Sequence, residues 1–184
     1  MSQPDHWTDT CETLPTCHRT DTTAGYRAQV ALYAAYGSNL DPDQMRERCP
    51  HSPVESVGWL KGWRLTFAGE EVGWDGALVT LVQEPNAQTY VMLYDVSPLD
   101  EKVLDEWEGA GLSGAGLYDK LRVRVSTLEG DKLAWTYVLV AYEGGLPSCH
   151  HLGLIADAAE KAGAPADYVA EIRNRECSGS APSD

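Results

Sequence analysis

The sequence predicts an α+β fold, a small mixed or antiparallel β-barrel of about six strands with flanking helices. Three observations favour this class. Runs rich in β-forming residues come in pairs separated by turn-like residues. Helices with clear capping signals are inserted between these pairs. The chain has 184 residues, enough for one domain with a sizeable core. We therefore predict a domain over residues 28–176, between a disordered or loosely packed arm at 1–27 and a flexible tail at 177–184.

The ordered part is expected to begin with a strand and a short helix. The apolar run from Val30 to Tyr36 is typical of a buried strand, and Gly37 ends it in a sharp loop. Asp41 is a good N-cap and Pro42 fits the first helical position, so a short helix is predicted over residues 43–48.

The middle of the chain predicts three strands. Residues 54–68 form an apolar, aromatic run broken by Gly58 and Gly62, which indicates a strand with a bend or bulge. Two further runs, 77–83 and 89–96, are separated by Glu84-Pro85-Asn86. This spacing predicts an antiparallel hairpin.

The second half predicts one more hairpin and three helices. Ser97 and Pro98 give the signals of a helix start, and that helix is expected to end near Gly109. Strands are expected at 118–128 and 133–142, with Glu129-Gly130-Asp131 as the turn between them.

Two C-terminal helices complete the prediction. Ser148 is placed to cap a helix over residues 149–162, and Pro165 opens a last helix that runs to about residue 175.

The charge of the chain excludes several classes of partner. The chain has 28 Asp and Glu residues against 14 Lys and Arg residues, a formal net charge of -14. Such a charge repels phosphate backbones and anionic membranes, so neither nucleic acid nor membrane is expected as a partner. No apolar run is long enough to cross a bilayer, and the N-terminal residues lack the hydrophobic stretch of a signal peptide. A cytoplasmic location is expected.

The five cysteines are an odd number and are widely spread: Cys11, Cys17, Cys49, Cys149 and Cys177. Without an export signal, this pattern predicts mostly reduced thiols rather than a disulfide framework. His6 and His18 flank the first two cysteines, but the close Cys pair typical of structural zinc sites is missing. A flexible arm without a metal site is therefore favoured.

The segment Tyr36-Gly37-Ser38-Asn39-Leu40 lies between the predicted buried strand and the capped helix. A Gly-Ser-Asn turn exposes consecutive backbone N–H groups, and the following helix N-terminus adds positive potential, so an anion or carbonyl oxygen can be held there. Gly and Asn also serve ordinary turns. Taken alone, the segment is better explained as a structural turn.

The same segment resembles the YGSN signature of the gamma-glutamyl cyclotransferase family, and later segments match that family in order and rough spacing. Leu104-Asp105-Glu106-Trp107-Glu108-Gly109 is similar to the family's Leu-Asp-x-x-Glu-Gly box. Gly116-Leu117-Tyr118 resembles its Gly-x-Tyr strand entry. Pro147-Ser148 resembles the start of its Pro-Ser-x-x-Tyr segment, where His151 stands at the Tyr position. The resemblance covers about residues 30 to 175.

The resemblance implies a closed β-barrel and an intramolecular aminolysis that needs neither a metal nor an organic cofactor. The α-amine of a γ-glutamyl substrate attacks its own side-chain carbonyl, giving 5-oxoproline and a free amine. Glu108 is implied as the catalytic acid/base, and the Tyr36 to Leu40 loop as the grip on the glutamyl group. Tyr118 and His151 are implied as further substrate contacts.

The proposed base must have a perturbed pKa. An ordinary Glu has a pKa of about 4.3 and an α-amino group one of about 8, so a useful base needs its pKa raised by burial. Trp107 and the aromatic-rich strands are expected to supply the apolar surroundings of Glu108.

The identity of the released amine is not encoded in these motifs. The glutathione-specific branch usually lacks the residue matched by Asn39, so γ-glutamyl amino acids or amides are favoured as substrates. His151 and the long glycine-rich segment 109–116 are expected to affect specificity more than reaction type. A homodimer is left open.

Two other functions are weighed against this one. A non-catalytic protein of the same fold could bind a small carboxylated ligand or a partner, although the presence of Glu108 argues against it. A thiol enzyme could use Cys49 or Cys149 with a nearby His. Because adjacent residues such as Cys149 and His150 seldom form a working dyad, this alternative is disfavoured.

Overall fold

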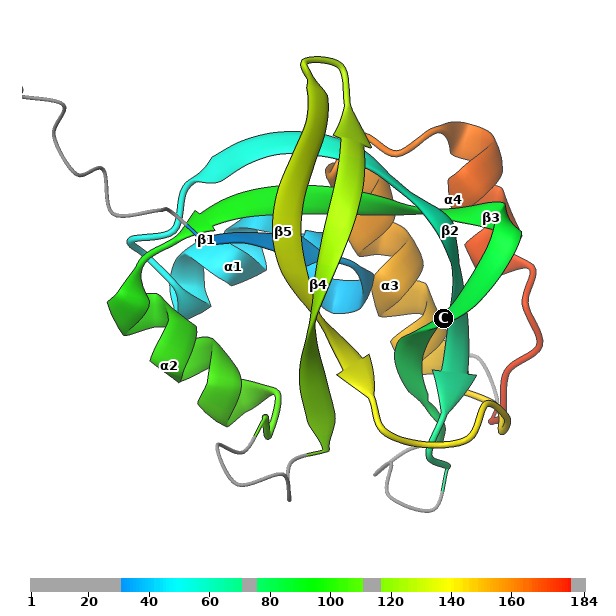
Figure 1. Ribbon diagram of the computed structural model, residues 1–184. Helices are drawn as coiled ribbons and strands as arrows, with labels where there is room; N and C mark the ends of the chain where they lie inside the picture. The colour runs from blue at the N-terminus through cyan, green and yellow to red at the C-terminus, as the bar shows by residue number, and fades with distance from the viewer. Residues whose placement is uncertain (1–30, 71–75, 111–116, 180–184) are drawn as a thin grey trace, which may run out of the picture.

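Strands close into a barrel and helices lie against it (Figure 1). The computed structural model describes residues 31–70, 76–110 and 117–179. In chain order the elements are β1 (Ala31–Ala35), the 3₁₀ helix η1 (Gly37–Leu40), α1 (Pro42–Arg48), β2 (Val54–Ala68), β3 (Leu78–Val96), α2 (Pro98–Trp107), β4 (Tyr118–Thr127), β5 (Gly130–Leu139), α3 (Cys149–Lys161) and α4 (Ala166–Arg173). The predicted α+β class with a closed barrel and flanking helices is confirmed.

The barrel closes through one parallel pairing. The strand order is β1-β3-β2-β4-β5, and β5 returns to β1 where Tyr33 lies opposite Trp135. The other neighbouring strands run antiparallel. The sheet is therefore mixed, as predicted, but the described residues contain five strands rather than about six.

The hairpin predicted around Glu84-Pro85-Asn86 is wrong. The two runs on either side belong to one long strand, β3, which pairs with β2 along most of its length. The register of this pairing shifts between Lys61 and Trp63, so the predicted turn residues form an exposed bulge in a continuous strand. Pro85 is tolerated because a bulge does not require the N–H that proline lacks.

The second predicted hairpin is confirmed. β4 and β5 pair antiparallel from Tyr118 opposite Leu139 to Thr127 opposite Gly130. The turn begins one residue earlier than the expected Glu129, because Thr127 already pairs with Gly130. Gly130 follows the turn with φ +113°, a backbone conformation that favours glycine.

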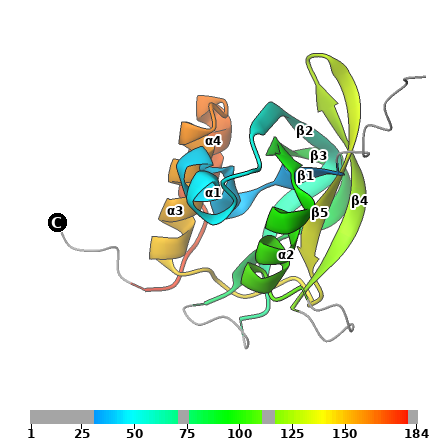
Figure 2. The same cartoon turned by 90° about the vertical axis from the view of Figure 1, so that its left-hand side faces the viewer.

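Capping signals placed the helices correctly. Asp41, Ser97 and Ser148 each accept a backbone N–H at the start of a helix, and Pro42 and Pro98 occupy the first helical positions. Figure 2 shows α1, α3 and α4 together on one side of the barrel, with α2 apart from α3 and α4.

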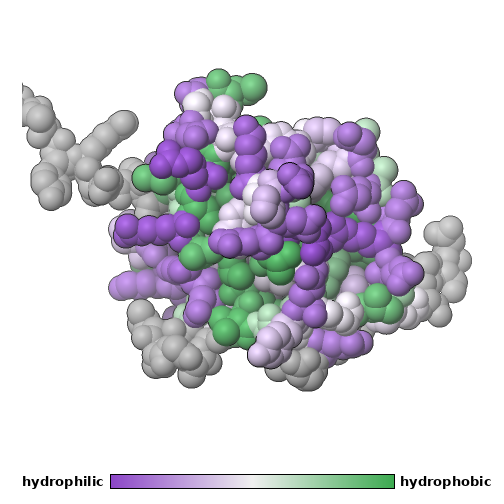
Figure 3. Space-filling view, turned by 45° about the vertical axis from the view of Figure 1, so that its right-hand side comes forward, coloured by the Kyte–Doolittle hydropathy of each residue, from purple (hydrophilic) through white to green (hydrophobic). Residues whose placement is uncertain are grey.

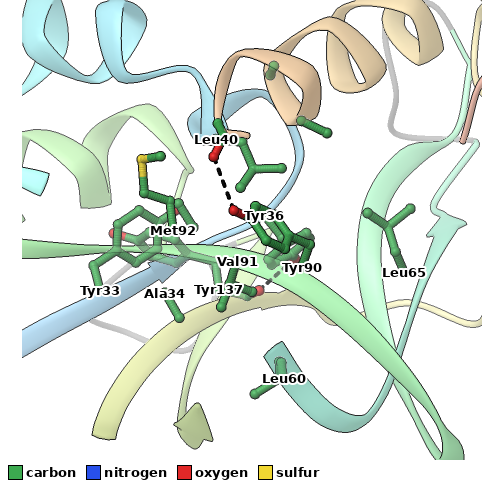
Figure 4. Close-up of a cluster of buried hydrophobic side chains, with 14 of the residues drawn as sticks. Tyr33, Ala34, Tyr36, Leu40, Leu60, Leu65, Tyr90, Val91, Met92 and Tyr137 are labelled. Atoms are coloured by element: carbon green, nitrogen blue, oxygen red, sulfur yellow. Dashed lines mark hydrogen bonds between the residues drawn. The ribbon is translucent and has the colours of Figure 1, made fainter. Parts of the chain in front are cut away.

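The barrel interior contains many tyrosines (Figure 4). Tyr33, Tyr94 and Tyr137 are at most 2% exposed. The Tyr33 ring stacks on Trp135 with ring centroids 4.7 Å apart. Buried hydroxyls need partners, and that of Tyr94 donates to the backbone carbonyl of Asn39 at 3.2 Å. The core thus supplies polar groups beside the loop that follows β1.

The molecular surface is mainly polar. The face in Figure 3 is largely hydrophilic, with patches of hydrophobic side chains between the charged ones. Ion pairs such as Arg173 with Asp157 and Glu160 link helices α3 and α4. No helix among the described residues is long and apolar enough to cross a membrane.

The expectation of reduced thiols is wrong for two of the five cysteines, which form a disulfide. Cys149, the first residue of α3, is bonded to Cys177, which follows α4. The chain returns from α4 to the start of α3, where Ser178 pairs with Ser148. Sequence spacing carries no signal of this return. Cys49 keeps a free, buried thiol.

Several predictions fall outside the described residues. They include the N-terminal arm at 1–27 with its cysteines and histidines, the segment 111–116 and the chain end at 180–184. The described part of the predicted tail is held in place, because Cys149 donates its backbone N–H to Ser178 and Ser178 donates its own to Pro147.

Candidate active site

Glu108 caps the C-terminal end of α2. Its backbone N–H donates to the carbonyl of Leu104 at 2.9 Å. Gly109 follows with φ +60°, a left-handed conformation that commonly ends a helix. Because Leu104 is fully buried, this end of the helix is fixed against the core. The Glu108 side chain is thereby held, partly buried, where it meets Asn39.

Asn39 joins the loop after β1 to the end of α2. Its side chain, in a residue only 4% exposed, makes three hydrogen bonds. Asn39 Nδ2 donates to Glu108 Oε1 at 2.8 Å and to the Tyr33 hydroxyl at 3.0 Å. Asn39 Oδ1 accepts from Arg48 Nη1 at 2.7 Å. One amide therefore connects groups from β1, α1 and α2.

Tyrosines form the surroundings of this cluster. Tyr33 packs edge-on against Tyr137 with centroids 5.6 Å apart. Tyr36 donates its hydroxyl to the backbone carbonyl of Tyr137 at 2.6 Å. Tyr118 donates its hydroxyl to the carbonyl of Val79 at 3.1 Å. These aromatic rings shield the cluster from solvent, and their own hydroxyls have hydrogen-bond partners.

The buried setting perturbs the acidity of the cluster. Burial raises the pKa of Glu108, whereas the Asn39 amide and the positive charge of Arg48 lower it, and burial prevails. Burial also raises the pKa of Tyr33 and of Tyr118, and the negative charge of Glu108 raises both further. The cluster therefore holds a carboxyl group that is a stronger base than an exposed Glu, among tyrosines that stay neutral.

The loop residues predicted for substrate binding lie in η1 and at its start. Gly37 has φ +71°, and a Cβ placed there would lie 2.9 Å from Val79 Cγ1. Glycine is thus required for both conformation and space. The Ser38 carbonyl accepts the Asp41 N–H at 3.1 Å, and Leu40 is fully buried. The inner side of the loop is consequently packed into the core.

Tyr118 and His151 come from two other elements. Tyr118 opens β4 and lies close enough to Glu108 for the carboxylate to raise its pKa. His151 lies in the first turn of α3, where its backbone N–H donates to the Ser148 hydroxyl at 3.1 Å. The structure thus brings Asn39 and Tyr118 to Glu108, and it places His151 in the helix that packs on η1.

The thiols are poorly suited to nucleophilic chemistry. Cys49 is 1% exposed, and burial together with the nearby Asp100 raises its pKa to about 11. Cys149 is engaged in the disulfide with Cys177. A thiolate is the reactive form of cysteine, so neither residue presents one at neutral pH. Within ranges 31–70, 76–110 and 117–179, no three His, Cys, Asp or Glu side chains are grouped to hold a metal ion.

A separate hollow of about 450 Å³ lies between β2, the bulge in β3 and α4. Trp59 and Tyr168 line its apolar part, and none of the cluster residues around Glu108 contributes to it. Its arginines are already paired, Arg64 with Glu84 and Glu143 and Arg175 with Glu171. The hollow is therefore not part of the candidate site.

Sequence reasoning missed two members of the cluster, Tyr33 and Arg48. Tyr33 stands in an apolar run and was expected only as part of a buried strand. Arg48 and Arg46 both lie in the last turn of α1, so the sequence offers nothing to separate them. In the structure Arg48 reaches Asn39, whereas Arg46 pairs with Asp43 on the surface.

Comparisons with known proteins find relatives of similar sequence. The model of the AIG2-like family matches residues 88–172. The chain is 28% identical over 155 residues to the mouse protein named Gamma-glutamylcyclotransferase, covering 82% of this chain and 81% of the relative. It is 28% identical over 147 residues to the human protein of the same name, covering 77% of each.

Solved structures share the fold. A structure titled "Gamma-glutamyl cyclotransferase" superposes with a TM-score of 0.74 at 26% identity, over 83% of this chain and 92% of that one. YkqA from Bacillus subtilis superposes with a TM-score of 0.67 at 18% identity, over 81% of this chain and 56% of that one, and shows the fold alone. The chain is therefore similar to gamma-glutamyl cyclotransferases both in sequence and in its closed barrel fold.

Proposed function

We propose that this protein is a gamma-glutamyl cyclotransferase that converts a γ-glutamyl amine or amino acid into 5-oxoproline and the free amine, with Glu108 as the general acid/base. The observation that carries the proposal is the hydrogen bond of 2.8 Å between Asn39 Nδ2 and Glu108 Oε1. This bond joins the two segments that most resemble the family, which lie 69 residues apart in the chain.

The reaction is a cyclisation that balances within the substrate. The α-nitrogen forms a bond to the γ-carbonyl carbon, and the bond from that carbon to the amine nitrogen breaks. Glu108 accepts a proton from the attacking nitrogen and returns it to the leaving nitrogen. No water and no net proton are consumed. Because both reacting groups belong to one molecule, the protein mainly has to fold the substrate into a reactive conformer.

The surroundings of Glu108 suit this exchange. The raised pKa of its carboxyl group lies nearer to that of an amine than the pKa of an exposed Glu does, so proton transfer in both directions is easier. Glu108 Oε1 is occupied by the Asn39 amide. We assign the second carboxylate oxygen, Oε2, to the substrate nitrogen.

The glutamyl group is assigned to the loop from Tyr36 to Leu40. Support comes from Gly37, whose left-handed conformation turns the backbone directly after β1, and from Asn39 in the same loop, whose side chain donates to the Tyr33 hydroxyl at 3.0 Å. Tyr118 is proposed to close the pocket beside Glu108, and His151 to contact the substrate from α3.

The test is a panel of γ-glutamyl amines and amino acids offered to the purified protein, with 5-oxoproline measured by mass spectrometry. Glu108→Gln keeps the size of the side chain and removes the base. Glu106→Gln is the matched control, because Glu106 lies two residues earlier on the exposed side of the same helix. Turnover in wild type and Glu106→Gln but not in Glu108→Gln is expected. Saturable binding of a γ-glutamyl compound without any 5-oxoproline would instead favour the non-catalytic alternative.

Cytoplasmic location and homodimer formation are further proposals. The Cys149–Cys177 disulfide weighs against a cytoplasmic location, because disulfides are uncommon in reducing compartments. Cell fractionation against a cytoplasmic marker tests the first proposal, and analytical ultracentrifugation tests the second.

A further inference from the structure

We propose that Arg48 is a positioning residue for Glu108 and acts through the side-chain amide of Asn39. This inference rests on the proposed function and extends it to a residue outside the matching segments. Arg48 ends α1, and its guanidinium contacts Asn39 and the ring of Trp107. It therefore reaches the carboxyl group through an intermediate group rather than by touching the reacting atoms.

Arg48 determines which end of the Asn39 amide faces Glu108. A guanidinium can only donate hydrogen bonds, so the oxygen end, Oδ1, must face Arg48. The nitrogen end then donates to Glu108 Oε1 and to Tyr33. If the amide were turned by half a revolution, its oxygen would face the Glu108 carboxylate, which has no donor, and its N–H groups would face the Arg48 guanidinium, which has no acceptor. Arg48 thus fixes the orientation in which Asn39 donates to an ionised Glu108.

The fixed amide in turn fixes the carboxyl group. With Glu108 Oε1 held by Asn39, rotation of the carboxyl plane is restricted, and Oε2 keeps one direction. Among the residues that the structure describes, none donates a hydrogen bond to Oε2, so this oxygen is left for a substrate nitrogen. Misplacing a reacting group by about 1 Å can lower a rate by about 10²-fold, so loss of this restraint on Oε2 should lower kcat.

Arg48 is itself held in place by Trp107. The guanidinium carbon lies 4.7 Å from the centroid of the Trp107 ring, a cation–π geometry. Trp107 immediately precedes Glu108 in the chain, so this contact joins the ends of α1 and α2. A cation in the last turn of a helix also interacts favourably with the helix dipole.

Arg48 also favours the ionised form of Glu108. Its positive charge lowers the pKa of Glu108 against the effect of burial. The titratable side chains that face Glu108 from the barrel strands and the loop are tyrosines whose own pKa values are raised, so they stay neutral: Tyr33, Tyr36, Tyr118 and Tyr137. Removal of Arg48 should therefore raise the pKa of Glu108 and move the acid limb of the activity profile to higher pH.

The experiment compares three variants with γ-glutamyl-L-alanine as the probe. Arg48→Met keeps the long side chain and removes both charge and donor. Arg48→Lys keeps the charge but cannot both stack and donate as a planar guanidinium does. Arg46→Met is the matched control, because Arg46 is in the same helical turn, with a side chain 70% exposed and paired with Asp43. Steady-state rates are measured across pH, and the pKa of Glu108 is measured by ¹³C NMR, assigned by the signal lost in Glu108→Gln.

For Arg48→Met we expect a fall in kcat of about 10²-fold with a smaller change in KM, an acid limb at higher pH and a raised Glu108 pKa. Arg48→Lys should keep the wild-type acid limb and still lose kcat. If Arg48→Met does not fold, the result for Arg48→Lys decides. Wild-type kcat and an unmoved Glu108 pKa in the Arg48 variants would overturn the proposal while wild-type turnover upholds the proposed function. Absence of turnover in wild type would instead refute the proposed function. The effect of Arg48 on Glu108 would then be tested by the NMR titration alone, through the change in the Glu108 pKa in Arg48→Met.

Discussion

Replacing Asp100 with Ala should destabilise the fold by about 3–5 kcal/mol. Asp100 is 2% exposed, and its carboxylate accepts hydrogen bonds from the His51 N–H and the Ser52 hydroxyl, each at 2.8 Å. A hydrogen bond to a charged group contributes roughly 1.5–3 kcal/mol, and Ala leaves both donors without an acceptor. Both bonds go to the same carboxylate oxygen, Oδ2, so the amide oxygen of Asp100→Asn can still accept them without the negative charge, and a smaller loss of about 1–3 kcal/mol is expected.

The stabilisation by Asp100 should also depend on pH. Burial raises the pKa of Asp100, but hydrogen bonds from Ser52 and His51 lower it more, so the folded state has the lower pKa. The stabilisation is therefore fully present above the unfolded pKa and is lost as pH falls through the folded pKa. Wild type should lose stability below about pH 4, and Asp100→Asn should lose less over the same range.

Urea denaturation of wild type, both Asp100 variants and Glu106→Gln at pH 7 measures these differences. Glu106 is exposed, so its replacement should change stability by less than about 0.5 kcal/mol. An Asp100→Ala variant as stable as Glu106→Gln would refute the reasoning. Loosening of α2 should also lower turnover, because Asp100 and Glu108 stand at opposite ends of the helix.

The remaining predictions concern the disulfide, the barrel and the pH profile. Cys149→Ser removes the disulfide that closes a loop of sequence separation 28, so the free energy of unfolding should fall by about 3.5 kcal/mol in the chain-entropy model. Turnover should be retained. Equal urea midpoints for oxidised and reduced wild type would contradict this prediction. Gly58→Ala places a Cβ 2.7 Å from the Ser126 carbonyl and should lower stability by about 1–3 kcal/mol, which a thermal melt would detect. Because burial raises the pKa of Glu108 above 4.5, kcat/KM should increase with pH through a limb that lies above pH 4.5, and a limb at or below that value would count against Glu108 as the base.

Helix starts could be predicted because capping is local. Asp41, Ser97 and Ser148 each bond to an N–H two or three residues ahead, so the signal lies within one short segment. The bulge at Pro85 could not be predicted in this way. Whether a proline-containing segment turns or bulges depends on the partner strand, and β2 continues past it.

Only part of the candidate site could be predicted from the sequence, because the rest depends on contacts between different elements. The segments of Asn39 and Glu108 carry a recognisable pattern, so both residues could be singled out from the sequence. Tyr33 and Arg48 join them only through contacts between different elements. The disulfide was missed for the same reason, since Cys149 and Cys177 meet only after α4 brings the chain back.

The rate of 5-oxoproline formation by Glu108→Gln at saturating γ-glutamyl-L-alanine tests the central claim most directly. A general base typically contributes about 10²–10⁴-fold, so we predict a loss of that size in kcat, with Glu106→Gln at the wild-type rate and both variants folded. A Glu108→Gln variant that releases 5-oxoproline at the wild-type rate would contradict the assignment of this carboxyl group as the proton carrier.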